Sequence, residues 1–158
     1  MYEDHICTAA KIMAETMKNA DIPMYGARLR LPDRKAIIAL LKEMRQLLFP
    51  AYFGDPAIMT LAAADYAALL LERIETSLAK QIALALPPEQ EEQAPRIARE
   101  VVDQLPRIQQ LLLTDIDAIF DGDPAAQNRE EIVLAYPGLF AIFAYRVSHE
   151  LYLRHVPT

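Results

Sequence analysis

Two carboxylates in the C-terminal third of the sequence stand on a short bend. Asp121 and Asp123 flank Gly122, and Pro124 follows directly. Glycine permits a positive φ, aspartate bonds to its own backbone and proline fixes φ, so the residues alone favour a turn. The same carboxylates could also bind a cation or a ligand. The spacing of the neighbouring residues decides whether a cation site is plausible.

A calcium loop fits this spacing only in part. With Gly122 at the obligatory glycine position, Asp117 and Asp121 fall on ligand positions. However, Ile119 stands where an oxygen ligand is needed, and Asn128 stands where a bidentate glutamate is needed. Because two ligands fail, we predict no calcium site.

The sequence offers no complete active site of its own. Ser148 next to His149, and Cys7 near His5, lack the oriented third member of a catalytic triad. His5 and His155 lie at opposite ends of the sequence and have no metal-ligand spacing. The four glycines are scattered, so they cannot form a phosphate-binding loop. We therefore predict no catalytic residue, no metal site and no cofactor site in this chain.

Arg146 and His149 are three residues apart on a predicted helix, so they share a face. From the residues alone, the simplest role of this pair is a contact with Glu150 or with a neighbouring helix.

Two blocks of the sequence resemble a known family. The first consists of Asp121-Gly122-Asp123-Pro124-Ala125-Ala126, Glu131-Ile132, Tyr136-Pro137-Gly138 and Tyr145-Arg146-Val147-Ser148-His149-Glu150-Leu151-Tyr152. The second is Met44-Arg45-Gln46-Leu47-Leu48-Phe49-Pro50-Ala51-Tyr52-Phe53-Gly54. In order and spacing, the first block resembles the N-terminal helical domain of bacterial serine acetyltransferases. The second resembles the subgroup with an extended helical N-terminus. Residues 1–31 and 60–107 carry no diagnostic motif.

The resemblance implies a function for the whole enzyme that this chain cannot perform alone. In the family, a left-handed parallel β-helix follows the helical domain and carries the catalytic machinery. The β-helix's hexapeptide repeats and the Asp-His-x-x-Gly segment with the catalytic base are absent from this sequence. The enzyme acetylates L-serine with acetyl-CoA, which gives O-acetyl-L-serine and coenzyme A in the first step of cysteine biosynthesis. The resemblance therefore implies an assembly domain at the edge of the substrate pocket, with acetyl-CoA as a co-substrate and no resident cofactor.

The resemblance also assigns roles to three residues. Asp123 matches the aspartate of an Asp-Pro-Ala motif that reaches the serine pocket, where a carboxylate can pair with the ammonium of serine. Arg146 and His149 match an Arg-x-x-His motif on the helix that packs and leads into the β-helix. We expect these two to be positioning or interface residues.

The expected partners follow from the same family. The helical domain joins β-helix trimers into hexamers there, so we expect this domain to self-associate, as a dimer through an apolar helix face. Cysteine synthase docks on the far C-terminal tail in the family, and such a tail is missing from this sequence. Neither the oligomer size nor any feedback by cysteine follows from the residues.

Glycine and proline breaks divide the sequence into about six helices in one domain over residues 1–158, an all-α bundle without strands. The predicted helices span 2–20, 34–49, 60–86, 97–119, 129–136 and 139–155. Continuous helical phase across Pro106 favours a kink rather than a break. Asn128 and Glu131 form a predicted capping pair, and Pro137 with Gly138 is expected to close the short helix.

Composition narrows the possible partners and compartment. A net charge of −6 disfavours binding to nucleic acid or anionic membranes. Cys7 is the only cysteine, which excludes an intramolecular disulfide and favours the cytoplasm. The acidic first residues are unlike a signal peptide. The apolar run 61–71, interrupted by Asp65, is too short to span a bilayer.

Two alternatives stay open at this point. One is a stand-alone helical interaction module with no role in acetyl transfer, in which the Asp121–Pro124 bend is only a turn. The other is a self-sufficient small-molecule enzyme, which would have to turn over acetyl-CoA with these residues alone.

Overall fold

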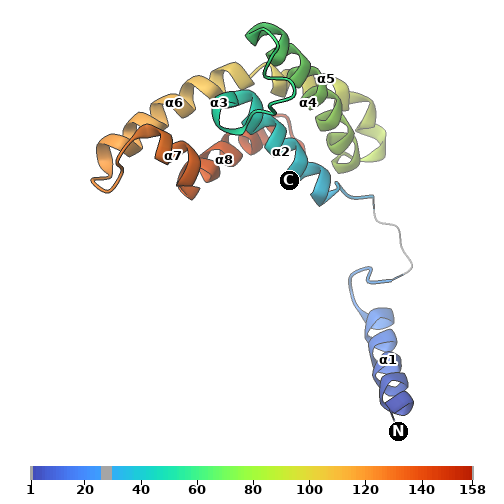
Figure 1. Cartoon of the computed structure of the whole chain (residues 1–158). Coiled ribbons are helices and arrows are strands. Elements are labelled where there is room, and N and C mark those ends of the chain that lie inside the picture. Colours follow the sequence, from blue (N-terminus) through green and yellow to red (C-terminus); the bar gives the residue numbers. More distant parts are fainter. Residues whose placement is uncertain (1, 26–29, 158) are drawn as a thin grey trace. The chain divides into compact units, whose positions relative to one another are not determined.

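The computed structural model describes residues 2–25 and 30–157, with side chains from residue 5 onwards, and this part of the chain is helical without strands (Figure 1). The elements are α1 (Tyr2–Asn19), α2 (Arg34–Leu48), α3 (Pro50–Phe53), α4 (Ala63–Ala85), the 3-10 helix η1 (Pro88–Gln93), α5 (Ala94–Val102), α6 (Leu105–Gly122), α7 (Arg129–Ala135) and α8 (Pro137–Leu153). The predicted all-α class is confirmed.

The chain divides into two compact units, Met1–Leu31 and Pro32–Thr158. The first unit contains α1, whose predicted apolar stripe is not covered by other residues of this unit: Ile6 is 65% exposed and Met13 is 58% exposed. A helix with a bare apolar stripe gains little stability from its own unit. The single domain expected over residues 1–158 stays a prediction.

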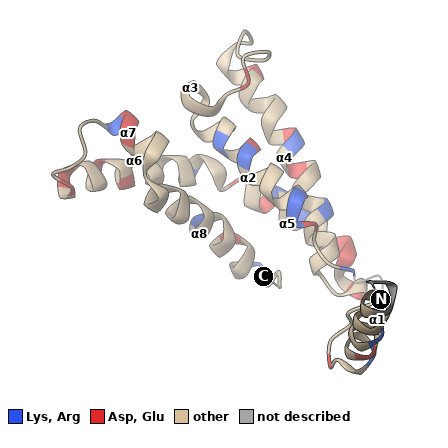
Figure 2. Cartoon of the chain, turned by 60° about the horizontal axis from the view of Figure 1, so that its bottom comes forward, with Lys and Arg blue, Asp and Glu red and all other residues tan. Residues whose placement is uncertain are grey.

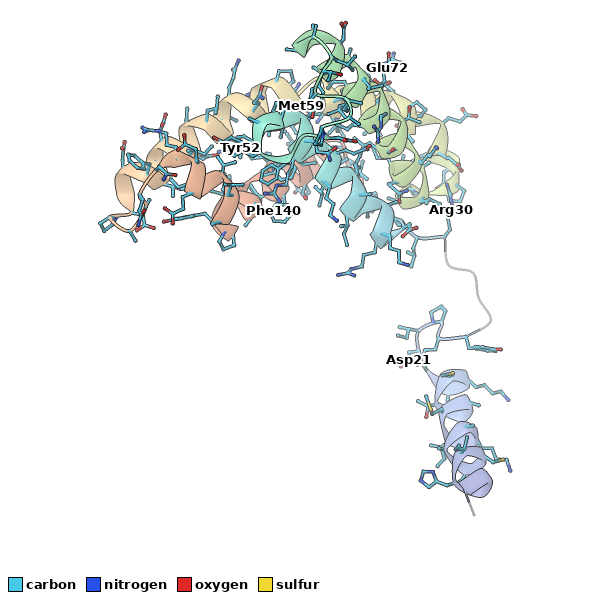
Figure 3. All side chains as sticks on the ribbon, viewed as in Figure 1. Asp21, Arg30, Tyr52, Met59, Glu72 and Phe140 are labelled. Carbon is cyan, nitrogen blue, oxygen red and sulfur yellow. The ribbon has the colours of Figure 1, made fainter. Side chains whose placement is uncertain are left out.

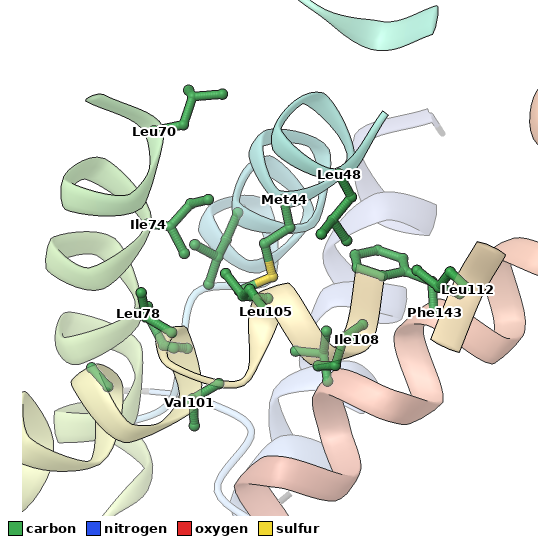
Figure 4. Close-up of a cluster of buried hydrophobic side chains, with 14 of the residues drawn as sticks. Met44, Leu48, Leu70, Ile74, Leu78, Val101, Leu105, Ile108, Leu112 and Phe143 are labelled. Carbon is green, nitrogen blue, oxygen red and sulfur yellow. The ribbon is translucent and has the colours of Figure 1, made fainter. Parts of the chain in front are cut away.

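The second unit is organised around α4, which packs against both α2 and α5. Every fourth residue of α4 is buried, in the order Tyr66, Leu70, Ile74, Leu78 and Ile82. This stripe meets Met44 and Leu48 of α2, and the same core continues through α5 and α6 to Phe143 of α8 (Figure 4). Burial of each large aliphatic side chain contributes about 1.5–3 kcal/mol. The apolar lines predicted for these helices from helical periodicity therefore form the core.

The chain breaks between α5 and α6, so the predicted kink is wrong. Asp103 and Gln104 form a turn, in which the Gln104 N–H donates to the carbonyl of Val101 at 3.0 Å. Pro106 occupies the first turn of α6, where a backbone N–H has no intrahelical partner. Proline is therefore accommodated there without loss of a hydrogen bond. The apolar residues of α5 and α6 keep the same helical phase although α6 is a new helix.

Three other boundaries differ from the expectation. The short helix α3 and the 3-10 helix η1 lie in segments expected to be connectors. Pro137 begins α8 instead of closing α7, since proline is also favoured at the first position of a helix. The predicted cap of α7 is confirmed, because the Asn128 side chain accepts from the N–H of Glu131 at 2.8 Å.

The corner between α2 and α3 is tightly built. The Arg45 guanidinium lies 3.8 Å from the ring centroid of Phe53 on α3 and 5.2 Å from that of Phe140 on α8. Figure 3 labels Tyr52 of α3 and Phe140 of α8, the two helices that each supply a ring near Arg45. Burial lowers the pKa of Arg45. Cation–π contact thus joins α2 to both α3 and α8.

The end of α8 is fixed by backbone and side-chain bonds. The Val156 N–H donates to the carbonyl of Leu151 at 3.1 Å, and the His155 N–H donates to that of Tyr152 at 2.9 Å, with His155 at a φ of 56°. This is a Schellman motif, and its apolar member Val156 is buried. Arg154 adds bonds to Glu150 of α8 and Glu100 of α5. The last helix is therefore anchored to α5.

Among the described helices, none is by itself long and apolar enough to cross a membrane, and α7 with α8 meets those criteria only as a pair bent by 69°.

Gly54→Ala tests the corner after α3. A Cβ at Gly54 would lie 2.4 Å from the carbonyl oxygen of Pro50, so the backbone must shift. We expect a loss of about 2 kcal/mol in the free energy of unfolding, within the range for steric conflict in packed sites. Gly138→Ala is the matched control, because nothing lies within 4 Å of that Cβ and alanine is the better helix former. Denaturant unfolding of both variants measures the difference, and equal stabilities would contradict the steric account.

Candidate functional site

Asp123 lies at the junction that follows α6. Its own N–H caps the helix by donating to the carbonyl of Ile119 at 2.9 Å. Because Pro124 follows, the α-helical region is disfavoured for Asp123, and its backbone is extended with φ −111° and ψ 104°. The helix therefore ends here, and the carboxylate is turned into the bend.

Both oxygens of the Asp123 carboxylate have a donor. Oδ1 accepts from the N–H of Ala125 at 2.9 Å, which is the local bond expected of an aspartate turn. Oδ2 accepts from the hydroxyl of Tyr136 at 2.9 Å. The side chain is half-buried. The turn interpretation is thus correct locally, and a long-range contact to the start of α8 adds to it.

The segment after the bend is held from both sides. Glu131 accepts from the N–H of Gln127 at 3.0 Å. Arg129 reaches back to α6, where its Nε donates to Asp117 at 2.6 Å and its guanidinium lies 4.5 Å from the ring centroid of Phe120. The bond to Asp117 raises the pKa of Arg129. The loop that connects α6 to α7 is therefore held by side-chain bonds from Glu131 and Arg129.

Arg146 and His149 have different contacts in the structure. Arg146 forms a two-pronged bond to Asp115 of α6, with Nε and Nη2 at 3.1 and 2.8 Å from the carboxylate oxygens. His149 is exposed, and its ring stacks on Tyr145 at 5.8 Å and on Tyr152 at 6.4 Å. Within the described residues, no bond joins either side chain to Asp123. Arg146 therefore fixes α8 on α6, whereas His149 belongs to a solvent-facing aromatic row.

Acidic residues gather where α6 meets α7 (Figure 2). Two of these carboxylates already hold arginines, Asp115 with Arg146 and Asp117 with Arg129. Across residues 2–25 and 30–157, no three His, Cys, Asp or Glu side chains are grouped to hold a metal ion.

A separate cavity of about 510 Å³ lies between the end of α2, the start of α4 and the start of α6. Its lining is mostly apolar and includes Leu48, Met59, Tyr66 and Leu105, with Gln109 as a polar member. Among the described residues that line it, none has a charged side chain, and the Tyr66 phenol is the one titratable group. The Asp123 bend is therefore the better candidate site.

Sequence reasoning did not assign a role to Tyr136. The Tyr136-Pro137-Gly138 motif marked a break, but no periodic signal predicts that the phenol would bond to a carboxylate 13 residues earlier. Its bond to Asp123 is the main cause of a raised Tyr136 pKa, with desolvation as a second cause.

Comparison with known proteins identifies the family. Residues 64–144, just over half of the chain, match the family model described as serine acetyltransferase, N-terminal. The chain belongs to the serine acetyltransferase family. The matched segment contains both Asp123 and Tyr136, while Arg146 and His149 lie just beyond it.

Individual relatives support the assignment. The chain is 31% identical to the plasmid serine acetyltransferase of Synechococcus elongatus over an alignment of 140 residues, which covers 80% of this chain and 44% of that protein. It is 52% identical to the serine acetyltransferase of Bacillus subtilis over 44 residues, 28% of this chain and 20% of that protein.

A solved structure shows the same fold. Serine acetyltransferase isoform 3 from Entamoeba histolytica, determined in complex with cysteine, superposes with a TM-score of 0.65 at 21% identity, over 94% of this chain and 50% of that one. The chain thus spans about half the length, or less, of the serine acetyltransferases it matches.

The bond between Asp123 and Tyr136 predicts a specific titration. The raised pKa means that stabilisation by the Tyr136 hydroxyl is complete below the ordinary tyrosine pKa of about 10 and is lost as pH rises through the higher folded value. In Asp123→Asn, we expect the Tyr136 pKa to fall towards its ordinary value. NMR titration of ¹³Cζ-labelled tyrosines measures this.

Tyr66 is the internal control for that titration. Its pKa is raised mainly by burial, with a smaller effect of Asp55, so Asp123→Asn should leave it raised. A Tyr136 titration that does not move in the variant would mean that the bond is absent in solution.

Proposed function

We propose that this chain is the N-terminal domain of a serine O-acetyltransferase, in which it assembles the enzyme and places Asp123 at the edge of the serine pocket. The whole enzyme transfers the acetyl group of acetyl-CoA to the hydroxyl of L-serine, which gives O-acetyl-L-serine and coenzyme A and begins cysteine synthesis. We place this reaction in the cytoplasm, because its reducing environment keeps a free thiol such as that of Cys7 reduced.

One observation carries the proposal within this chain. The family-matched segment includes a half-buried carboxylate that is fixed by two donors and has remaining acceptor capacity. A carboxylate offers about four lone-pair positions, and the two bonds to Asp123 use two of them. The rest can accept N–H donors, and the ammonium of serine supplies three. A charge-assisted bond of this kind is about twice as strong as a neutral one.

The proton chemistry is assigned to another part of the enzyme. Attack of the serine hydroxyl on a thioester requires a base within hydrogen-bond reach of that hydroxyl. The groups that bond to Asp123 are the N–H of Ala125, which is no base, and the Tyr136 hydroxyl, whose raised pKa makes it a poor base at neutral pH. We therefore assign the base to the portion of the relatives that this chain does not span.

The position of Asp123 limits how the pocket can be completed. Tyr136 precedes α8, whose 17 residues extend over about 25 Å at 1.5 Å per residue. Asp123 thus lies at the opposite end of α8 from Leu153. In the proposed enzyme, the remaining pocket residues come from polypeptide that runs back along α8 or from a second copy.

The assembly role rests on apolar helix surface. Exposed Ile6 and Met13 lie on one stripe of α1, and a stripe of this kind is commonly covered by another helix. We propose a second copy of the chain as the partner, which gives a dimer here and hexamers in the whole enzyme. Docking of cysteine synthase would use segments outside this chain. Arg146 keeps its proposed positioning role through Asp115, and His149 is proposed to lie at an interface with its tyrosine neighbours.

Asp123→Asn tests the pocket role. Residues 1–158 are joined to the C-terminal part of the Synechococcus elongatus plasmid enzyme, and initial rates are measured over a range of L-serine concentrations. Loss of a charge-assisted bond of about 1.5–3 kcal/mol predicts a KM for serine raised by about 10- to 100-fold, with the KM for acetyl-CoA unchanged.

Asp121→Asn is the matched control, because Asp121 is exposed in the last turn of α6, two residues before Asp123, and its substitution removes the same charge. If both variants leave serine kinetics unchanged, Asp123 is only a turn residue. If residues 1–158 yield no active enzyme when they are joined to the C-terminal part of any serine acetyltransferase, the result favours a stand-alone interaction module.

Met13→Glu tests self-association. A charge in the apolar stripe of α1 should shift the chain from dimer to monomer, because a buried unpaired carboxylate is strongly unfavourable. Lys11→Glu is the control, since helical geometry places Lys11 away from the stripe. Light scattering at high micromolar concentration measures the mass. A monomeric unmodified chain would contradict the assembly role.

A further inference from the structure

Both the backbone and the ring of Tyr136 are held in place by neighbouring residues. It ends α7, where its N–H donates to the carbonyl of Ile132 at 3.3 Å, and it immediately precedes α8. Pro137 disfavours the helical region for Tyr136, whose backbone is extended with φ −84° and ψ 110°. The ring is half-buried and packs against the core of the second unit. The direction of the phenol is therefore set by two helices and a packed ring.

The hydroxyl of Tyr136 meets a carboxylate whose other oxygen is already held. Ala125 fixes Oδ1 of Asp123 from within the bend, and Tyr136 fixes Oδ2 from across it. With only the local bond, the carboxylate could turn about χ2, which is a broad torsion for aspartate. With both bonds, the carboxylate plane is defined by two separate parts of the chain.

We propose that Tyr136 is a positioning residue for substrate, which orients the Asp123 carboxylate to receive the ammonium group of serine. This inference rests on the proposed function, because it assumes that Asp123 faces the amino acid. It adds a residue to which neither the motif nor the family match assigns a role.

The chemistry of the hydroxyl suits that task. A tyrosine hydroxyl is protonated throughout the neutral range, and the bond to Asp123 raises its pKa further, so it can donate to the carboxylate there. A preorganised carboxylate loses less side-chain freedom when the substrate binds, and small errors in such geometry weaken binding. The bond leaves the outward lone pairs of Oδ2 free for the substrate.

Tyr136→Phe tests the inference in the fusion enzyme described above. The ring and its packing are kept, and only the hydroxyl is lost. We expect the KM for L-serine to rise about three- to tenfold with kcat little changed. The KM for 3-hydroxypropionate, which has the hydroxyl and carboxylate of serine but no ammonium, should stay the same. General damage to the fold would affect both substrates.

Two further variants define the outcomes. Tyr52→Phe removes an exposed hydroxyl elsewhere and should change neither KM. In Asp123→Asn with Tyr136→Phe, the serine KM should match that of Asp123→Asn alone, because the tyrosine acts only through the carboxylate. Additive losses, or equal losses with both substrates, overturn the positioning role.

The failure of this inference is distinct from that of the proposed function. If Asp123→Asn raises the serine KM and Tyr136→Phe does not, Asp123 contacts substrate and Tyr136 is merely structural. If Asp123→Asn itself has no effect on serine, the pocket assignment fails and the positioning role fails with it. In that case, the tyrosine titration in the 158-residue chain still reports whether the bond exists.

Discussion

Burial of a shared apolar seam organises the second unit of this protein. Met44, Leu70, Ile74 and Leu112 come from three helices and are fully removed from solvent in one cluster (Figure 4). Because protein interiors are close-packed, this seam fixes α2, α4 and α6 relative to one another. Polar contacts then act at its margins: Arg146 holds α8 on α6 through Asp115.

Two proline residues shape the candidate site on that scaffold. Pro124 and Pro137 each force the preceding residue out of the helical region, and those preceding residues are Asp123 and Tyr136. One helix therefore ends at a carboxylate and another ends at a phenol. The packing of α6 against α7 and α8 brings the two together. Proline thus ends both helices and, by doing so, sets the backbone positions from which Asp123 and Tyr136 form their bond.

Much of this architecture is predictable because it depends on local signals. Helical periodicity identified the buried faces of α4, α5 and α6, and the Asn128 cap followed from the spacing of one amide and one glutamate. The position of α6 was harder, since Pro106 is compatible with a kink or with the first turn of a new helix. Both alternatives keep the same apolar phase, so only the turn at Asp103 distinguishes them.

The candidate site was predictable in part for a different reason. Asp123 stands in a motif, whereas its bond to Tyr136 depends on how three helices pack, and no local pattern encodes that. Arg146 and His149 illustrate the same limit. Their spacing suggests a shared face, yet one side chain contacts a neighbouring helix and the other stacks between tyrosines in solvent. Their different contacts depend on tertiary packing, which the spacing of two residues along one helix does not encode.

The environment of Arg45 gives one joint of the fold a distinctive response to ionic strength. Its guanidinium is flanked by the rings of Phe53 and Phe140, and no carboxylate among the described residues pairs with it. Dissolved ions screen water-exposed pairs such as Arg96 with Glu100. A short-range, partly desolvated contact with an aromatic face is screened much less. In concentrated salt, the α2, α3 and α8 joint therefore keeps its attraction while the surface charge network fades.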